Sequence, residues 1–349
     1  MTAIQWEVSR MIGFAFGCFF IAFISTPTVV KLLKKYKMGK SIRDADSAPV
    51  MSKMHAAKSG TPTMGGIVIW GSVLIVVGLV WLLSWLMPES ALTGWNIISR
   101  SQTLLPFGAM LAAAAIGLVD DYLNIRRIGP KGGGLRMRHR LLAFTAIAGV
   151  CAWWFYSKLD WSSIHIPFDG NLELGWLYIP FFIFVIVATQ HSVNLTDGLD
   201  GLVGGTLMAA FGAYGGIAFM QGRADLAVFC AAIIGALLAF LWHNINPAVF
   251  FMGDTGAMAL GTTLGIIAML TNQPLLLPII GIPFVIESLS VIIQMISKKL
   301  RNGKKVFKSS PLHHHLEALG WGEPKVVMRF WIVSFMFAIL GLLIHMIDG

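Results

Sequence analysis

Residues 226–243 read LAVFCAAIIGALLAFLWH, and this run holds no aspartate, glutamate, lysine or arginine. The hydrocarbon core of a bilayer is about 30 Å thick, so a helix that crosses it needs about 20 mostly apolar residues. Similar runs recur along the chain, at 9–31, 65–87, 103–120, 141–156, 174–193, 202–220, 226–243, 256–272, 275–296 and 327–346. We therefore expect an all-α, polytopic membrane protein of about ten transmembrane helices, although short connections between some runs leave nine or eleven open.

The composition is typical of this class. Of the 349 residues, 56% are hydrophobic and 12% are charged, whereas soluble domains carry about 25% charged residues. Cys18, Cys151 and Cys230 all lie inside apolar runs and are interpreted as buried small side chains. We expect residues 1–349 to form a single integral-membrane domain.

Lysine and arginine predict the orientation, because cytoplasmic loops carry an excess of both. If the N-terminus is outside, three segments on the inner side, at 31–58, 126–140 and 298–329, hold most of the basic residues. Of the 26 basic residues, those left on the outer side are Arg10, Arg100, Lys158 and Arg223. A miscount by one span would scatter these clusters over both faces, so they also favour ten spans.

Five aspartates gather at the predicted cytoplasmic ends of the runs. Asp120 and Asp121 lie in L-V-D-D-Y, Asp197 and Asp200 in N-L-T-D-G-L-D-G-L, and Asp254 in F-M-G-D-T-G. Acidic residues at membrane depth are costly and usually face a polar cavity. One of them alone would be an ordinary solvated helix end, but five on one face indicate a shared site on the cytoplasmic side.

Clustered carboxylates favour a hard cation. Mg²⁺ takes one or two carboxylates and leaves room for phosphate oxygens, so we expect Mg²⁺ as the cofactor. Zinc is disfavoured, because the consecutive His313, His314 and His315 lack the i,i+4 spacing of a helical zinc pair. In the run P-L-H-H-H we interpret them as a phosphate- or substrate-binding loop, with a plain surface loop as the alternative.

Further polar residues are expected on the same side. The segment 54–66 supplies His55, Lys58 and Thr63 just before an apolar run, and helix N-termini and lysines attract anions. Phe251 is either a ring on which a base stacks or an ordinary interfacial aromatic residue. Glu287 and Gln294 lie seven residues apart on one helix face and are interpreted as packing groups.

Taken together, the motifs resemble one known family, the phospho-N-acetylmuramoyl-pentapeptide-transferases. The aspartate motifs alone indicate the wider polyprenyl-phosphate sugar-1-phosphate transferases. The motifs G-T-P-T-M-G-G (60–66) and P-L-H-H-H (311–315) indicate the muramoyl-pentapeptide branch. In chain order the motifs are G-T-P-T-M-G-G (60–66), L-V-D-D-Y (118–122), N-L-T-D-G-L-D-G-L (194–202), N-P-A-x-x-F-M-G-D-T-G (246–256) and P-L-H-H-H (311–315). The resemblance extends from Lys31 through the last apolar run.

This resemblance implies a reaction of peptidoglycan synthesis. UDP-N-acetylmuramoyl-pentapeptide and undecaprenyl phosphate would give lipid I and UMP, with Mg²⁺. It implies a multi-pass homodimer in the bacterial inner membrane, with both termini periplasmic and the active site facing the cytoplasm. The expected partners are the two substrates and membrane lipids, and no nucleic acid is expected.

The resemblance also carries over residue roles. It implies Asp120, Asp121 and Asp254 as the essential catalytic acids, with Asp254 as the Mg²⁺ ligand. Asp197, Gly198, Leu199, Asp200 and Phe251 resemble a uridine pocket. The remaining implied substrate-binding residues are Lys58, Thr63, Asn194, Asn244, His313, His314 and His315.

Three positions depart from the family pattern. Residues 190–194 read Q-H-S-V-N, so His191 stands where the family usually has an asparagine. Arg140 stands where a lysine is more usual, and residues 131–134 are unusually rich in glycine. These departures concern the detail of the site, whereas the motifs that indicate the reaction are intact.

Two other functions and two mechanisms stay open. A related transferase for UDP-N-acetylglucosamine would share the aspartate motifs, and an ion-coupled transporter would also hold intramembrane acids. For the transferase we expect direct attack by the lipid phosphate, with Asp120 deprotonating or positioning it. A covalent phospho-aspartate is the alternative.

Overall fold

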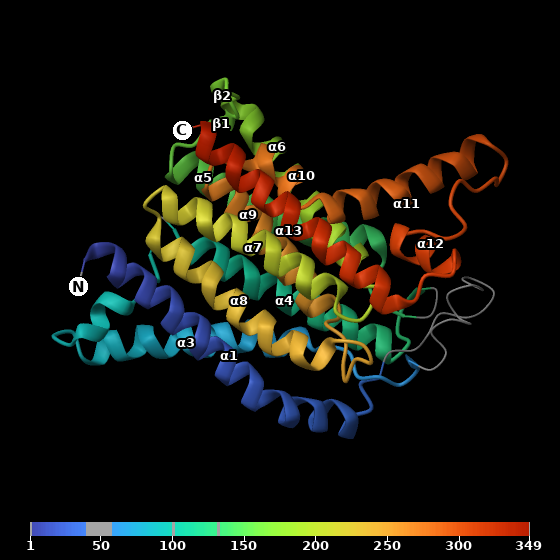
Figure 1. Cartoon of the computed structure of the whole chain (residues 1–349), viewed down its shortest axis with the longest axis horizontal. Helices are drawn as coiled ribbons and strands as arrows, with labels where there is room; N and C mark the ends of the chain where they lie inside the picture. Colours follow the sequence, from blue (N-terminus) through green and yellow to red (C-terminus); the bar gives the residue numbers. More distant parts are fainter. Residues whose placement is uncertain (1, 40–57, 100–101, 131–132, 349) are drawn as a thin grey trace.

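The structure is a computed structural model that describes residues 2–39, 58–99, 102–130 and 133–348. Its long helices form one bundle (Figure 1). They are α1 (Ala3–Lys35), α3 (Gly66–Leu86), α4 (Leu104–Ile125), α5 (Met137–Lys158), α6 (Tyr178–Thr196), α7 (Leu202–Met220), α8 (Ala224–Asn244), α9 (Asp254–Leu270), α11 (Ile282–Leu300) and α13 (Glu323–Asp348). The shorter elements are η2 (Ala91–Trp95), β1 (Ser163–Ile166), β2 (Gly170–Glu173), η4 (Gly175–Leu177), η5 (Pro274–Leu276), α10 (Leu277–Ile280) and α12 (Leu312–Ala318). His55, Lys40, Arg43, Lys53, Arg100 and Lys131 lie outside the described residues.

Each predicted transmembrane run coincides with a helix or with a broken pair of helices. Among the described residues, eight helices are long and apolar enough to cross a membrane, or nine if the bent pair around Gly281 is one span. The remaining run is α9, which has only 17 residues. The chain is therefore an all-α, multi-pass membrane protein, and ten is an approximate count of its spans.

α9 is enclosed by the other helices. Its residues from Thr255 to Leu270 are all buried, and α4 and α6 pack along it. A helix that meets no lipid need not match the thickness of the bilayer, which explains how 17 residues suffice. Because Asp254 is the first residue of α9, the same packing fixes the position of this acid.

α4 approaches the start of α9 backbone to backbone at Gly117. A Cβ atom on Gly117 would lie 2.5 Å from the carbonyl oxygen of Asp254 and 2.6 Å from Cα of Thr255. Only glycine allows such an approach. The contact lies one helical turn before Asp120 and Asp121, so it brings these two acids beside Asp254.

α11 leaves the bundle as an arm (Figure 1) and makes an angle of 82° with the preceding short helices. Its two faces differ. The buried residues on one face include Glu287, Ser290, Gln294 and Ser297, whereas the exposed large apolar residues are Leu289, Ile292, Ile293, Met295, Ile296 and Leu300. One side of the arm thus contacts its own chain, and the other presents an apolar surface suited to lipid.

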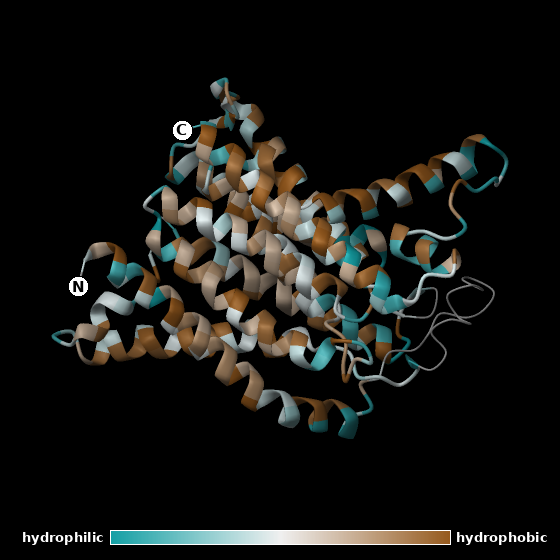
Figure 2. Cartoon of the chain, viewed as in Figure 1, coloured by the Kyte–Doolittle hydropathy of each residue, from teal (hydrophilic) through white to brown (hydrophobic). Residues whose placement is uncertain are grey.

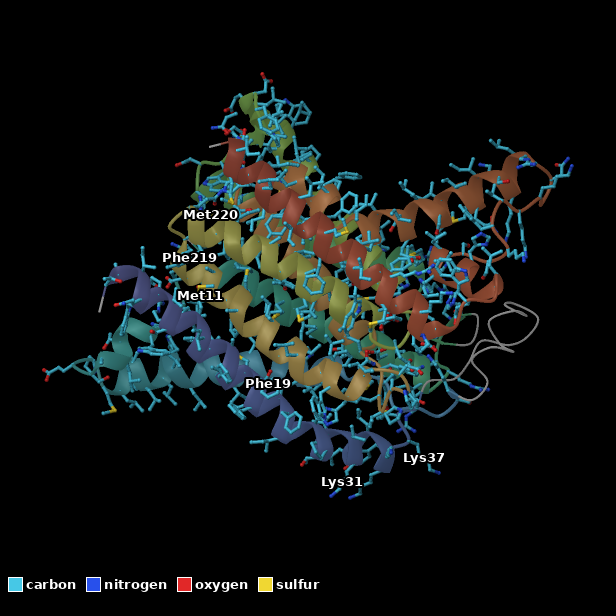
Figure 3. All side chains as sticks on the ribbon, in the orientation of Figure 1. Met11, Phe19, Lys31, Lys37, Phe219 and Met220 are labelled. Carbon is cyan, nitrogen blue, oxygen red and sulfur yellow. The ribbon has the colours of Figure 1, made fainter. Side chains whose placement is uncertain are left out.

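The two ends of the bundle differ in polarity. Figure 2 shows hydrophilic residues gathered at the end where α12 and the adjoining loops lie. Lys31 and Lys37 lie toward this end of α1, whereas Met11, Phe219 and Met220 lie toward the other (Figure 3). The basic clusters and the aspartates therefore share one end of the molecule, as the sequence predicts.

The opposite end carries a feature that sequence reasoning missed, an antiparallel hairpin of β1 and β2. His165 Nε2 on β1 lies 2.5 Å from Oδ2 of Asp348, and the backbone N–H of Phe168 donates to Asp348 Oδ1 at 2.5 Å. The hairpin is thereby joined to the last turn of α13. Both chain termini lie toward this end (Figure 1).

Candidate active site

Asp120 and Asp254 meet at the polar end of the bundle, although they are far apart in sequence. Arg140 Nη1 donates to Asp120 Oδ2 at 2.7 Å and to Asp254 Oδ2 at 3.2 Å. Asp120 also accepts the backbone N–H of Leu135 at 2.6 Å. Asp120 is 4% exposed and Asp254 is 20% exposed, so Asp254 is the acid that a ligand can reach.

Asp121 accepts backbone N–H groups at the start of α9, whereas Asp120 pairs with Arg140. Its Oδ1 accepts the backbone N–H of Asp254 at 3.1 Å, and its Oδ2 accepts that of Thr255 at 3.0 Å. The first N–H groups of a helix have no partner within the helix, and a carboxylate there also interacts favourably with the helix dipole. Asp121 therefore caps α9 and fixes the orientation of Asp254.

The end of α6 supplies two further groups to the same cluster. Asn194 Nδ2 donates to Asp254 Oδ1 at 2.7 Å. Asp197 Oδ2 accepts the backbone N–H of Gly253 at 3.2 Å. Three aspartate motifs that the sequence separates are thus brought together around Asp254, as predicted.

The segment 61–66 pairs with the segment that precedes α9. The backbone N–H of Phe251 donates to the carbonyl of Pro62 at 2.8 Å, and that of Gly65 donates to the carbonyl of Phe251 at 2.7 Å. Thr63 is buried between the two segments, and its backbone N–H donates to the carbonyl of Met38. This pairing brings the G-T-P-T-M-G-G and F-M-G-D motifs side by side at the start of α9.

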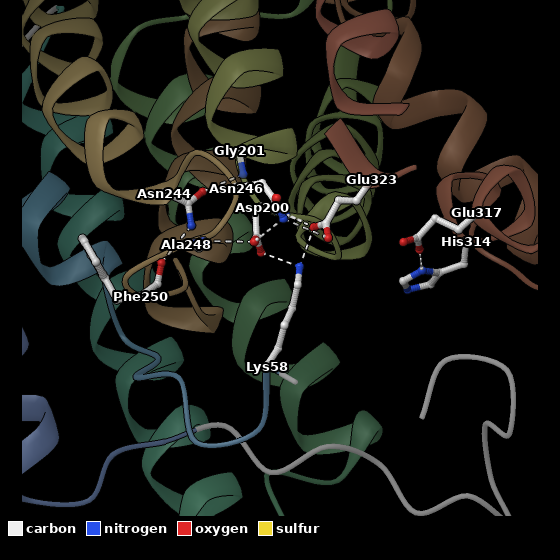
Figure 4. A network of polar contacts seen from close by, with 10 residues as sticks. All are labelled: Lys58, Asp200, Gly201, Asn244, Asn246, Ala248, Phe250, His314, Glu317 and Glu323. Atoms are coloured by element: carbon white, nitrogen blue, oxygen red, sulfur yellow. Dashed lines mark hydrogen bonds and ion pairs between the residues drawn. The ribbon is translucent and has the colours of Figure 1, made fainter. Parts of the chain in front are cut away.

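Lys58 lies between two carboxylates (Figure 4). Its Nζ is 2.6 Å from Asp200 Oδ1 and 2.5 Å from Glu323 Oε1. Asn246 Nδ2 donates to Asp200 at 3.0 Å and to Glu323 at 3.2 Å. Lys58 also lies 5.9 Å from the centre of the Phe251 ring, so two residues assigned to substrate binding are neighbours.

Asn244 and Leu199 hold the loops of the site in place. Asn244 Oδ1 accepts the backbone N–H of Gly201 at 2.9 Å, and its Nδ2 donates to the carbonyl of Phe250 at 2.8 Å. Leu199 is buried in a small apolar cluster with Val326 of α13. Both residues therefore join the loop after α6 to neighbouring elements.

The three histidines have different polar partners, although the ring centres of His313 and His314 lie 4.1 Å apart. His314 Nδ1 lies 2.8 Å from Glu317 Oε2, and His315 Nδ1 accepts the backbone N–H of Lys308 at 3.1 Å. His313 is buried and lies against the 197–200 loop: a Cβ on Gly198 would be 2.2 Å from His313 Nε2. His313 is thus the histidine that contacts the implied uridine pocket.

The buried face of α11 supports this histidine segment. Glu287 Oε1 accepts the backbone N–H of His313 at 3.2 Å, and Glu287 Oε2 lies 3.0 Å from His313 Nδ1. Gln294 accepts the N–H groups of Val306 and Phe307 at 3.0 Å and donates to the carbonyl of Phe307 at 2.8 Å. The sequence predicts a packing role for Glu287 and Gln294. In the structure both side chains form hydrogen bonds to the segment that contains or precedes His313.

The donor set around Asp254 suits a hard cation only in part. Its side-chain ligands are oxygens, from Asp254 and Asp120, which is the chemistry that Mg²⁺ prefers. Within the described part of the chain, no three His, Cys, Asp or Glu side chains form a group that could hold a metal ion. An ion held here would therefore take one or two carboxylates, as Mg²⁺ commonly does, and complete its shell with water and substrate oxygens.

Sequence reasoning did not find three polar residues of the site. Glu323 and Asn246 complete the network around Lys58, and Arg140 was noted only as a departure from a pattern. Arg140 Nε is buried and has no hydrogen-bond partner among the residues that the structure describes. Arg140 contacts both acids through Nη1 instead.

Family profiles match parts of the chain, related proteins match it over most of its length, and both agree with the family resemblance of the motifs. Residues 103–272 match the profile of glycosyl transferase family 4, and residues 58–69 match signature 1 of phospho-N-acetylmuramoyl-pentapeptide-transferase. The chain is 42% identical to the phospho-N-acetylmuramoyl-pentapeptide-transferase of Geobacillus thermodenitrificans, over 94% of this chain and 95% of that protein. It is 37% identical to the enzyme of the same name from Chloroflexus aurantiacus, over 98% of this chain and 91% of the relative.

Proposed function

Because the chain belongs to the phospho-N-acetylmuramoyl-pentapeptide-transferase family, we propose that the cluster around Asp254 is its active site. The protein is an enzyme of peptidoglycan synthesis. It transfers phospho-N-acetylmuramoyl-pentapeptide from its UDP-sugar to undecaprenyl phosphate and releases UMP. The observation that carries the proposed location is the single nitrogen of Arg140 that contacts acids of both α4 and α9.

The nucleotide is proposed to bind between the 197–200 loop and Phe251. Gly198 of this loop lies directly against His313, and Phe251 offers a ring for the uracil. Lys58 lies beside that ring and carries a positive charge for an anionic substrate. The pyrophosphate would then lie toward Asp254 and Arg140.

Asp254 is proposed to hold Mg²⁺, since it is more accessible than Asp120 and Asp121 and since Asp121 fixes its backbone. When bound, the ion supplies positive charge to the pyrophosphate oxygens, as divalent ions do in phosphoryl transfer. Asn194 orients the carboxylate through its hydrogen bond to Oδ1. Arg140 would keep its contact with Asp120 and supply positive charge beside the pyrophosphate.

The lipid phosphate is proposed to attack the sugar-side phosphate directly. At neutral pH it is largely ionised, because the second pKa of a phosphate is near 6, so Asp120 has mainly to position it. An apolar groove of about 340 Å³ between α5 and α6, lined by Ile183, Val187 and His191 among others, opens near Arg140. A groove of this kind suits the polyprenyl tail, which would bring the phosphate to the site from the bilayer.

Two alternatives are less well supported. The signature at 58–69 belongs to the muramoyl-pentapeptide branch, so a UDP-N-acetylglucosamine transferase is not favoured. An ion-coupled transporter would place its acids near the midplane, in broken helices. Here Asp120 and Asp121 lie in the last turns of α4, and Asp254 begins α9.

The setting of the enzyme is proposed from the same family membership. We propose the bacterial inner membrane, with the active site on the cytoplasmic face and with a homodimer as the assembly. The gathering of basic residues at the polar end of the bundle favours this orientation. Membrane lipids are the remaining expected partners.

The test is UMP release by the purified protein, with and without Mg²⁺ and lipid phosphate. We expect release to require both, and Asp254→Asn to lower it at least about 100-fold, because a charged group that acts on developing charge is worth that much. Asp169→Asn, in the exposed turn of the hairpin, is the matched control and should retain full activity. Wild-type turnover without a divalent ion, or an active Asp254→Asn enzyme, would refute the metal assignment.

A single-turnover assay decides between the two mechanisms. If the enzyme releases UMP from the sugar nucleotide without any lipid phosphate, a covalent intermediate forms and direct attack is wrong. We expect no UMP above the hydrolysis background until the acceptor is added.

A further inference from the structure

Glu323, the first residue of α13, joins three separate segments of the site (Figure 4). Its Oε1 accepts from Lys58 Nζ at 2.5 Å and from the backbone N–H of Asp200 at 2.7 Å. Its Oε2 accepts from Asn246 Nδ2 at 3.2 Å. The partners come from the segment before α3, the loop after α6 and the loop after α8, so Glu323 ties all three to α13.

The network is arranged so that the lysine faces the site. The side chain of Asp200 is 2% exposed and that of Glu323 is 12% exposed, whereas that of Lys58 is 21% exposed. Lys58 is thus the most exposed of the three side chains, and its ammonium group lies 5.9 Å from the centre of the Phe251 ring. A flexible lysine side chain loses rotamer freedom when it is fixed, and the two carboxylates fix it before any ligand binds.

Asp200 alone does not account for this arrangement. It already accepts from Lys58, from Asn246 and from the backbone N–H of Ala248 at 3.1 Å. Glu323 supplies the second acceptor for Lys58 and is the partner of the Asp200 backbone N–H. Glu323 thus acts on the side chain of Lys58 and on the backbone of the 197–200 loop at once.

We propose that Glu323 is a positioning residue for the sugar nucleotide, which holds Lys58 and the 197–200 loop in the geometry that the nucleotide requires. The inference rests on the proposed location of the nucleotide. It makes Glu323 specific to one of the two substrates, because the lipid phosphate arrives beside Arg140 and contacts none of these groups. A merely structural role would instead affect both substrates and the stability of the fold together.

The experiment measures kcat and KM for each substrate in Glu323→Gln, Lys58→Ala and the double variant. Glutamine keeps the shape and one acceptor for the Asp200 N–H but removes the charge that holds Lys58. We expect Glu323→Gln to raise KM for UDP-N-acetylmuramoyl-pentapeptide about tenfold. The kcat and the KM for undecaprenyl phosphate should stay within about twofold, and the melting temperature should stay near that of the wild type.

The double variant tests whether Glu323 acts through Lys58. Residues that act as a unit are non-additive, so Lys58→Ala with Glu323→Gln should be no worse than Lys58→Ala alone. Glu173→Gln, an exposed carboxylate on β2, is the matched control. Glu323→Asp, which keeps the charge on a shorter side chain, should recover part of the lost affinity.

Three results would each overturn the inference. One is a fall in kcat, in both affinities and in melting temperature together, which indicates a structural role. Another is an additive double variant, and the third is a Glu323→Gln enzyme with an unchanged KM. If Lys58→Ala raises KM while Glu323→Gln does not, only this inference fails; if neither variant affects KM, the proposed nucleotide site is also wrong.

Discussion

At the scale of single residues, Arg140 shows how one side chain can connect two acids. One nitrogen, Nη1, contacts both Asp120 and Asp254, so the planar fork of the guanidinium is not used in a bidentate way toward either acid. Arginine and lysine differ most where a bidentate pair is required. Here a compact ammonium group would satisfy the same two carboxylates, which is consistent with lysine as the usual residue in the family pattern.

We therefore predict that Arg140→Lys retains activity within about tenfold of the wild type, whereas Arg140→Met loses at least about 100-fold. The methionine removes the positive charge between Asp120 and Asp254 and leaves the two carboxylates to repel each other. UMP release under saturating substrates measures both variants. An Arg140→Lys enzyme as inactive as Arg140→Met would show that the guanidinium geometry itself is required.

The sequence predicts some of these residues and misses others for a physical reason. Asp120, Asp254 and Asn194 were found because carboxylates and amides are unusual beside apolar runs. Glu323 was missed because an acidic residue in the first turn of a helix is ordinary, being stabilised by the helix dipole. Its role comes from partners in three distant segments, and no local pattern reports such contacts.

At the scale of elements, the junction of α4 and α9 determines the geometry of the acids. The helix-length rule finds most spans, yet it presumes that a helix is surrounded by lipid. The run 256–272 already has the length of α9, 17 residues, but the sequence does not show that protein rather than lipid surrounds this helix. The 82° bend before α11 falls at Gly281, two residues before Pro283, where a sharp bend is expected, although its angle is not predictable from the sequence.

We predict that Gly117→Ala destabilises the protein by about 1–3 kcal/mol, as overpacking of a tight core does, and abolishes most of the activity. The added methyl would lie 2.5 Å from the backbone carbonyl oxygen of Asp254. Backbone atoms cannot move aside as easily as the end of a flexible side chain. Gly108→Ala, on the same helix with nothing within 4 Å of the new methyl, is the control. Thermal unfolding and UMP release compare the two; equal behaviour would mean that the close approach does not matter.

At the scale of the whole molecule, polarity separates the two ends of the bundle. The acids, the histidine segment and most of the basic residues lie at one end, and the hairpin and both termini lie at the other (Figures 1 and 2). The excess of lysine and arginine favours the first end as the proposed cytoplasmic end. Sequence reasoning predicted this division without locating the hairpin, because two strands of four residues carry too little pattern to be recognised.

Cysteine labelling tests this orientation. Asp169→Cys, on the hairpin turn, should react with a membrane-impermeant maleimide in intact spheroplasts, whereas Lys305→Cys should react only after permeabilisation. The native cysteines are all buried, so the unmodified protein gives a low background. The reverse pattern of labelling would place the active site outside the cell.

The bend at Gly281 allows α11 to move as a lever about that point. Nineteen helical residues span roughly 28 Å at 1.5 Å per residue. A rotation of about 10° at the bend would displace the far tip by about 5 Å, close to one helical turn. Glu287 and Gln294, which hold the segment that leads to His313, lie closer to the bend and would move by about 1–3 Å. A change in how the apolar face of the arm meets the surrounding lipid would therefore shift the proposed substrate-binding histidines.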